Sequence, residues 1–218
     1  LRRQRQMCIR DSVRRDRVMN VKPWMRVSSA LLAVAWGGNE FTPLLVMYRT
    51  VEGYEQVAVD MLLAAYVLGI VPALLIGGPL SDRHGRRALM IPAPILAMVG
   101  SILLALGAGS LVLLFVGRVF SGLALGLGMA VGTSWIKELS DRPYEEHPER
   151  VSGARRASLS LTAGFALGAV IAATLAQFAP LQTVLPYVIN LLICLPAVLL
   201  VAGAPETLSL IHISAPTR

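Results

Sequence analysis

The segment from Gly78 to Arg87 reads GPLSDRHGRR and separates two apolar runs, at about 58–79 and 89–107. A helix rises 1.5 Å per residue, so a run of about 20 residues crosses a hydrocarbon core of about 30 Å. Lipid offers no partner to an open sheet edge, and both runs are therefore expected to be helices. The segment predicts a loop at the membrane surface between two spanning helices.

Four more runs of the same kind surround this pair, at about 27–48, 111–134, 157–178 and 182–203. The chain of 218 residues is 55% hydrophobic and 15% charged, whereas a soluble domain has about 25% charged residues. This composition excludes a soluble globular enzyme and a disordered chain. We predict an all-α polytopic membrane protein with six transmembrane helices. Six spans are compatible with two inverted halves of three, an arrangement common in transporters.

Lysine and arginine are unevenly distributed between the two sides of the predicted spans. Counted over residues 13–208, the segment before the first span, the loop after the second and the connection after the fourth hold 13 of them, while the other side holds Arg49 alone. Basic residues collect in cytoplasmic loops, so we expect both ends of the six-helix unit in the cytoplasm and the protein in the plasma (inner) membrane. The net charge of +7 then reflects insertion in a lipid bilayer, and no nucleic-acid partner is predicted.

The segment after the second span follows the pattern G-x-L-x-D-R-x-G-R-R. Gly78 permits a close approach of helices, and Gly85 can adopt a positive φ in a tight turn. Asp82 can accept hydrogen bonds, and the arginines can pair with carboxylates or anionic headgroups. The pattern resembles the signature loop of the major facilitator superfamily, which implies a conformational-gating role for Gly78, Asp82, Arg83, Gly85, Arg86 and Arg87.

Two further segments are similar to patterns of the same family. Arg118-Val119-Phe120-Ser121-Gly122 resembles its R-x-x-x-G fourth-helix pattern, and Pro205-Glu206-Thr207-Leu208 resembles the P-E-T stretch before its central cytoplasmic loop. The resemblance implies that residues 13–208 form the N-terminal six-helix bundle of a larger fold, with a missing C-terminal six-helix half as its partner. We expect residues 1–12 and 209–218 to be non-native tails, because both resemble translated sequencing-adapter read-through.

Charge inside a span is costly and usually functional, and two charged residues in the predicted spans are candidates for a function. Glu40 in the first span and Arg118 in the fourth both lie roughly 10 Å from the outer boundary. The resemblance implies that these helices line a central cavity, so Glu40, Arg118 and Asn39 are candidates for proton coupling and for the cavity wall. The alternative places Glu40 at the outer water interface and Arg118 snorkelling. Asn39, Asn190 and Gln177 are candidates for hydrogen bonds to the solute, and polar contacts between helices are the alternative for them.

The cytoplasmic helix ends hold a second set of charges. Glu138 ends the fourth span, and Arg155 and Arg156 begin the fifth. Together with Asp82 and Arg86 they are candidates for a charge relay between helix ends. Solvated loop charges that contribute little are the alternative.

The fifth span contains Gly164-Phe165-Ala166-Leu167-Gly168-Ala169. This stretch is similar to the G-x-x-x-G-P motif of drug–proton antiporters in the same family, but Ala169 stands where the motif has proline. Gly164 and Gly168 are therefore either part of that motif or simple helix-packing positions.

These features predict a secondary active transporter that moves a small-molecule solute by alternating access, coupled to protons, and not an enzyme. Efflux of a drug or metabolite by antiport is the first expectation. The alternative within the class is a proton- or sugar-type symporter, and the alternative outside it is a non-transporting scaffold or receptor. The sequence offers no metal-ligand set, nucleophile triad or phosphate-binding G-x-x-x-x-G-K-[ST] loop, so we predict no metal and no cofactor.

Overall fold

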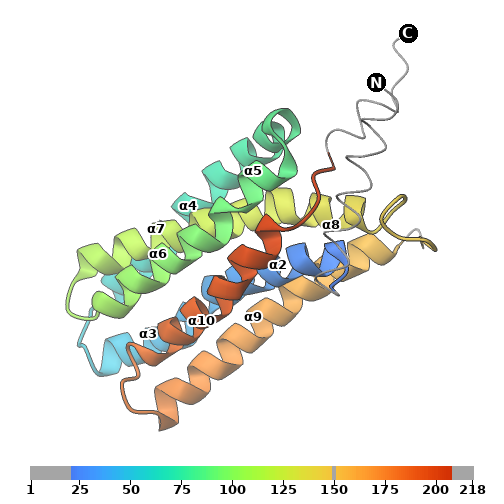
Figure 1. Cartoon of the computed structure of the whole chain (residues 1–218). Coiled ribbons are helices and arrows are strands. Elements are labelled where there is room, and N and C mark those ends of the chain that lie inside the picture. Colours follow the sequence, from blue (N-terminus) through green and yellow to red (C-terminus); the bar gives the residue numbers. More distant parts are fainter. Residues whose placement is uncertain (1–20, 149–150, 208–218) are drawn as a thin grey trace.

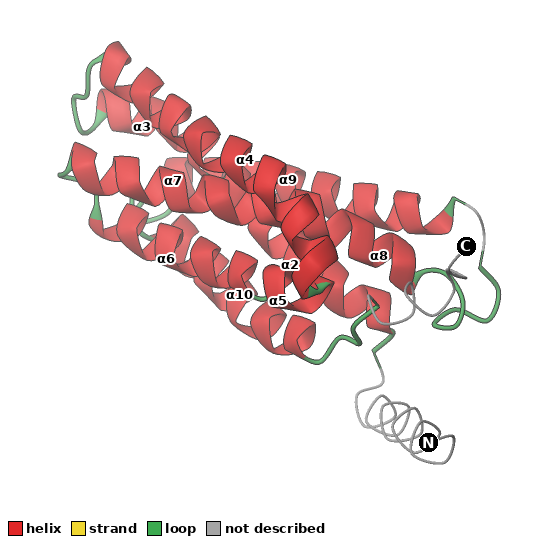
Figure 2. Ribbon diagram, turned by 90° about the horizontal axis from the view of Figure 1, so that it is seen from above, coloured by secondary structure: helices red, strands yellow, loops and turns green. Residues whose placement is uncertain are grey.

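The computed structural model describes residues 21–148 and 151–207, and the two expected tails lie outside the described residues. Every regular element in this part of the chain is a helix (Figure 2). Six helical stretches are long and apolar enough to cross a membrane, at Pro23–Thr50, Gln56–His84, Arg86–Leu106, Leu111–Leu139, Ser152–Phe178 and Leu185–Ala202. The protein is an integral membrane protein, and the predicted all-α fold with six spans is confirmed.

Three of the spans consist of more than one helical segment (Figure 1). The segments, in chain order, are α2 (Pro23–Asn39) and α3 (Phe41–Thr50) in the first span, α4 (Gln56–His84) in the second, α5 (Arg86–Met90) and α6 (Pro92–Leu106) in the third, α7 (Leu111–Leu127), the π-helical turn η1 (Gly128–Gly132) and α8 (Thr133–Leu139) in the fourth, α9 (Ser152–Phe178) in the fifth and α10 (Leu185–Ala202) in the sixth.

The first span is interrupted at Glu40, between α2 and α3. Pro43 has no N–H group, so the carbonyl of Asn39 lacks the donor that would continue the helix. Glu40 itself keeps helical torsion angles, with φ −63° and ψ −27°, and the two segments therefore continue in one direction across the break. The carboxylate of Glu40 therefore lies where the regular helical hydrogen bonding is interrupted.

The structure corrects the ends of two predicted spans. The second was expected to end near residue 79, but α4 continues through Pro79 to His84, so Gly85 alone separates it from α5. An internal proline removes one helical hydrogen bond, and the helix here continues past it. The sixth was expected to begin near residue 182, but residues 181–184 form a turn in which Leu181 has φ +56°, and α10 begins at Leu185.

The packing pattern has an internal symmetry. Two helices, α4 and α6, pack on α7, while α9 and α10 pack on α2, and α6 and α10 pack on each other. Exchanging the first, second and third spans with the fourth, fifth and sixth reproduces all of these contacts. The helices that carry Glu40 and Arg118 hold equivalent central places, which fits two inverted halves of three spans.

The contact between α9 and α2 depends on the two glycines of the fifth span. A Cβ atom at Gly164 would lie 2.5 Å from the carbonyl oxygen of Leu32, and one at Gly168 would lie 2.6 Å from that of Trp36. Any larger residue would push the helices apart, since backbone atoms cannot move aside as a side chain can.

Large apolar side chains cover much of the outer surface of the bundle. Leu75 on α4 is 71% exposed and Leu199 on α10 is 70% exposed, in a protein whose interior holds buried residues such as Trp135 and Leu31. Soluble monomers rarely expose apolar patches on this scale. An apolar surface on this scale fits a helix bundle embedded in a membrane.

Candidate functional site

Glu40 is fully buried at the junction of α2 and α3. The hydroxyl of Ser101, on α6, lies 3.5 Å from Oε1 as a donor, which is long for such a bond. Among the described residues, Oε2 has no hydrogen-bond partner. A buried carboxylate with one oxygen unpaired is costly unless it has a functional use or a nearby cation.

The nearby cation is Arg118, on α7, which is 1% exposed. Its guanidinium lies between two aromatic rings, 4.5 Å from the ring centre of Phe41 and 4.0 Å from that of Tyr66. Its Nε donates to the carbonyl of Leu62 at 3.4 Å, while Nη1 finds no partner within the described part of the chain. Cation–π contacts of this kind hold a guanidinium without neutralising its charge.

Glu40 and Arg118 are neighbours in the bundle interior, because the guanidinium of Arg118 lies over the ring of Phe41, the residue that follows Glu40. Burial of both side chains contradicts the alternative in which Glu40 lies at the outer water interface and Arg118 snorkels to it. Asn39 is not part of this pair: its amide donates to the carbonyl of Phe165 at 3.1 Å and accepts from Thr42 at 3.1 Å, so it links α2 to α9.

A second polar cluster lies at the other end of the bundle, around Arg86. Its guanidinium makes ion pairs with Asp82 at 2.7 Å and Glu138 at 2.9 Å, and it donates to the hydroxyl of Ser81 at 2.6 Å. These contacts connect the end of α4, the start of α5 and the end of α8. Asp82 lies in the last turn of α4, whereas the sequence predicted it in a loop.

Glu206 joins the same cluster from a point 120 residues further along the chain. Its carboxylate accepts the backbone N–H of Arg86 at 3.0 Å and that of Arg87 at 2.9 Å. Gly85 has φ +99°, and a Cβ there would lie 2.7 Å from Oε2 of Glu206, so glycine is required both for the turn and for this contact. Thr207 adds a hydrogen bond to Glu138. No local sequence pattern indicates this long-range capping.

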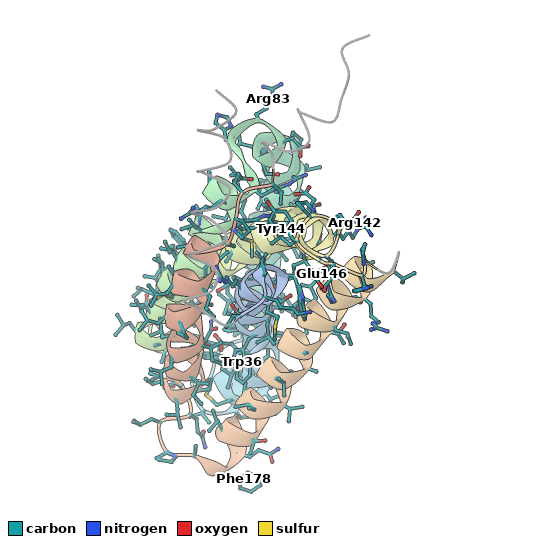
Figure 3. All side chains as sticks on the ribbon, turned by 45° about the vertical axis from the view of Figure 1, so that its right-hand side comes forward. Trp36, Arg83, Arg142, Tyr144, Glu146 and Phe178 are labelled. Atoms are coloured by element: carbon teal, nitrogen blue, oxygen red, sulfur yellow. The ribbon has the colours of Figure 1, made fainter. Side chains whose placement is uncertain are left out.

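The structure places the remaining residues of the predicted gating loop on the surface. Arg83 and the side chain of Arg87 are exposed, and Figure 3 shows Arg83 at the end of the bundle opposite Phe178. No atom lies within 4 Å of the place where a Cβ of Gly78 would stand. The close helix approach predicted at Gly78 is therefore not made within the described residues.

The predicted charge relay is only partly assembled. Glu138 pairs with Arg86, but Arg156 pairs instead with Glu145 at 3.1 Å, and Arg155 is exposed. Lys22 reaches the same Glu145 at 3.2 Å. The charges at these helix ends therefore form two separate groups, one around Arg86 and one around Glu145.

The Glu145 group ties the segment before the first span to the fifth helix. The guanidinium of Arg156 also lies 4.3 Å from the ring centre of Trp24. Hydrogen bonding and charge from Lys22, and then from Arg156, hold the pKa of the Glu145 carboxyl below its ordinary value, against a smaller opposing effect of burial. Glu145 therefore stays ionised in the folded state at a lower pH than it would in an unfolded chain.

Replacing Glu145 by glutamine is expected to lower the free energy of unfolding by about 1 kcal/mol near neutral pH, as for a partly exposed ion pair. Because the folded-state pKa is depressed, this contribution is complete above the ordinary pKa of 4.5 and is lost as the pH falls through the lower folded value. Thermal unfolding in detergent, followed for both proteins from neutral to acidic pH, measures it. A difference that stays constant with pH would contradict the ionic origin.

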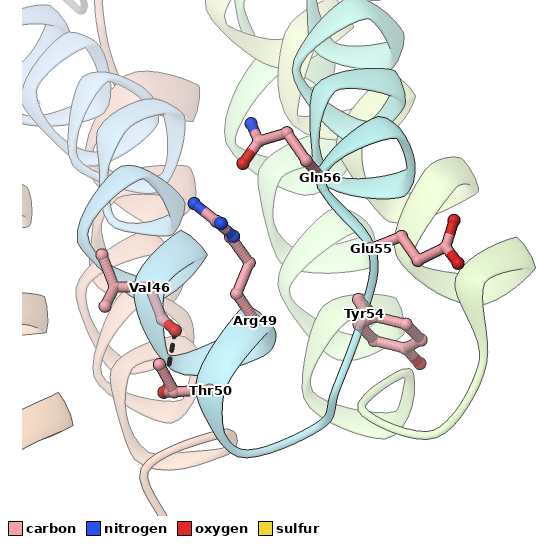
Figure 4. A pocket seen from close by; sticks show the side chains of 6 residues that line it. All are labelled: Val46, Arg49, Thr50, Tyr54, Glu55 and Gln56. Carbon is pink, nitrogen blue, oxygen red and sulfur yellow. Dashed lines mark hydrogen bonds between the residues drawn. The ribbon is translucent and has the colours of Figure 1, made fainter.

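At the opposite end, a cavity of about 420 Å³ lies between α3 and the start of α4 (Figure 4). It is lined by Val46, Arg49, Thr50, Tyr54, Glu55 and Gln56. Burial raises the pKa of Tyr54, whose hydroxyl donates to the carbonyl of Ala108 at 2.8 Å. The cavity contains neither Glu40 nor Arg118, so it is separate from the buried pair.

Comparison with known sequences shows to which family the chain belongs. The family profile described as "Major Facilitator Superfamily" matches residues 27–211. The chain is 34% identical over 95 residues to "Probable inositol transporter 2" of Arabidopsis thaliana, covering 44% of the chain and 15% of that protein. It is 34% identical over 83 residues to "Glucose transporter GlcP" of Staphylococcus epidermidis, covering 34% and 18%.

Solved structures agree on the fold. The proton:xylose symporter XylE bound to 6-bromo-6-deoxy-D-glucose matches with a TM-score of 0.67 and 19% identity, over 85% of this chain and 44% of that one. A D-xylose-proton symporter matches with a TM-score of 0.68 over 87% and 49%. The chain thus spans less than half the length of these proteins. It belongs to the major facilitator superfamily, a family of transporters and not of enzymes, and its six helices match one half of that fold.

Proposed function

We propose that this bundle is the N-terminal half of a proton-coupled symporter for a sugar- or polyol-like solute. The observation that carries the proposal is the buried pair of Glu40 and Arg118, on the two central helices of the bundle. A carboxylate is the only one of the two groups that changes charge at physiological pH, since arginine stays protonated. Glu40 is thus the proton acceptor and Arg118 the fixed charge beside it.

The proposed mechanism uses the difference between the two charge states of Glu40. Ionised Glu40 attracts Arg118, and this attraction favours one packing of the central helices. Protonation removes the attraction. The free-energy difference between the two packings then changes by the amount that the attraction contributed, and the population shifts toward the other packing. Alternating access follows when the six-helix bundle rocks against a second bundle around a site near the membrane midplane.

Symport of a sugar-like solute replaces drug efflux as the favoured reading. The matched relatives named above are inositol and glucose carriers, and the matched structures are of proton:xylose symporters. The fifth span has Ala169 in place of the proline typical of drug antiporters, and Gly164 and Gly168 have a packing use that needs no antiport motif. Each of these observations supports the symport proposal.

The cluster around Arg86 is proposed to be the gate at the cytoplasmic end. The arginine bridges α4 and α8, and Glu206 fastens the chain after α10 to the start of α5. Breaking these bonds together would release the second, third, fourth and sixth spans from one another. The excess of lysine and arginine on this side supports a cytoplasmic location for the Arg86 cluster. Both ends of the six-helix unit then lie on the cytoplasmic side of the plasma (inner) membrane.

Uptake by the full-length transporter that contains this bundle tests the proposal. In proteoliposomes with an inwardly directed proton gradient, we expect accumulation of labelled xylose, glucose or inositol, and its collapse on adding a protonophore. A labelled hydrophobic cation is the antiport probe. Expulsion of that cation together with no uptake of any of the three solutes would contradict symport and favour the efflux reading.

A further inference from the structure

Glu40 is the end point of a chain of hydrogen bonds that comes from the third and sixth spans. The thiol of Cys194 donates to Oδ1 of Asn190 at 3.4 Å, and Nδ2 of Asn190 donates to the hydroxyl of Ser101 at 2.8 Å. Ser101 in turn donates to Oε1 of Glu40 at 3.5 Å. All of these side chains are buried, with at most 1% exposure.

Every bond in this chain donates toward the carboxylate. A serine hydroxyl has one proton and two lone pairs. The amide nitrogen of Asn190 can only donate, so it occupies a lone pair of Ser101 and leaves the serine proton free to point at Glu40. The amide orientation is fixed in turn, because Cys194 supplies a donor and so requires the amide oxygen on its side.

The backbone makes room for this arrangement on the opposite side from Arg118. A Cβ at Gly37 would lie 3.2 Å from Cγ of Asn190 and nearer still to its amide nitrogen, so only glycine allows α10 to bring Asn190 this close to α2. Arg118 approaches from α7 between Phe41 and Tyr66. The carboxylate therefore has a donor hydroxyl from α6, while the cation of α7 lies beside the neighbouring Phe41.

Few other titratable groups face Glu40. Arg118 is on α7 and Tyr48 on α3, while Tyr187 and Cys194 are on α10. The hydroxyls of Tyr48 and Tyr187 are bonded to each other at 3.1 Å. Tyr66 on α4 faces Arg118, α6 carries no titratable side chain, and the only ones on α9 are Arg155 and Arg156 near its start.

We propose that Ser101 and Asn190 are positioning residues that orient Glu40 and set its proton affinity. The inference rests on the proposed coupling role of Glu40. Ser101 donates to Oε1, and a hydrogen bond to the charged form of a group favours that form. Asn190 acts through Ser101, because it directs the serine proton and strengthens the bond by polarising it. Without either residue, Glu40 holds its proton to a higher pH.

Infrared titration of the complete 218-residue chain in lipid nanodiscs measures this affinity. The carbonyl stretch of a protonated carboxyl group reports on Glu40, and its loss in Glu40→Gln identifies the band. We expect the midpoint to rise by about one pH unit, a tenfold change in proton affinity, in both Ser101→Ala and Asn190→Ala. Ser101→Thr keeps the hydroxyl and is expected to keep the midpoint.

Ser121→Ala is the matched control, since Ser121 is equally buried but its hydroxyl donates to Gly117 on its own helix. We expect no change there. Unchanged midpoints in Ser101→Ala and Asn190→Ala, or an equal rise in the control, would overturn this inference and leave the coupling role of Glu40 standing. If no pH-dependent band of Glu40 is found, both the positioning role of Ser101 and Asn190 and the coupling role of Glu40 are overturned.

Discussion

Accumulation of solute above its outside concentration, driven by the proton gradient, is expected to be lost when Glu40 is replaced by glutamine in the full-length transporter. Glutamine keeps the size of the side chain and its ability to form hydrogen bonds, but it cannot take up or release a proton. Alternating access remains possible, because a neutral side chain corresponds to the protonated state of Glu40. Exchange of labelled for unlabelled solute should therefore persist.

Counterflow and gradient-driven uptake in the same vesicles separate these outcomes. Glu52→Gln is a suitable control, because Glu52 lies exposed in the connection between the first two spans. Arg118→Lys is expected to weaken uptake as well, since an ammonium group cannot reproduce a planar guanidinium stacked between Phe41 and Tyr66. Full gradient-driven uptake by Glu40→Gln would show that Glu40 is a structural residue.

The second large effect is expected at the cytoplasmic cluster. Arg86→Ala removes the cation that pairs with Asp82 and Glu138, and it leaves Glu138, whose side chain is 23% exposed, with Thr207 as its remaining partner. Loss of hydrogen bonds to a charged group costs about 2 kcal/mol. We expect a lower midpoint of thermal unfolding in detergent and a marked loss of transport.

Arg83→Ala is the matched control for Arg86→Ala. Arg83 lies two residues before Gly85 in the same basic segment but points away from the bundle (Figure 3). Its removal is expected to change stability by less than about 0.5 kcal/mol, as is usual for an exposed position. Equal effects of the two variants would mean that the segment acts through its overall charge and not through the bonds of Arg86.

The sequence was sufficient for the features that depend on local composition. Long apolar runs fixed the number of spans, because a helix of about 20 apolar residues has few other stable environments. The charged pair was also recognisable, since Glu40 and Arg118 stand out in apolar surroundings. The positive φ of Gly85 was expected as well, because only a glycine adopts it readily.

Features that depend on residues far apart in the chain were missed or misplaced. Glu206 caps the start of α5 across 120 residues, and nothing near either segment indicates the partner. Arg156 was expected to join Glu138, but the fold brings Glu145 to it. Asn190 was left open between binding solute and joining helices, because its proximity to Ser101 arises only from the packing of α10 on α6.

The central claim is that Glu40 carries the proton that moves with the solute, and proton movement itself tests it most directly. The full-length transporter is reconstituted with a pH-sensitive dye inside the vesicles, without an imposed proton gradient, and solute is added outside. We predict that solute entry acidifies the interior of vesicles with the unchanged protein, and that Glu40→Gln vesicles, which still exchange labelled for unlabelled solute when preloaded, show no acidification. Solute-driven acidification of equal size in both would contradict the account.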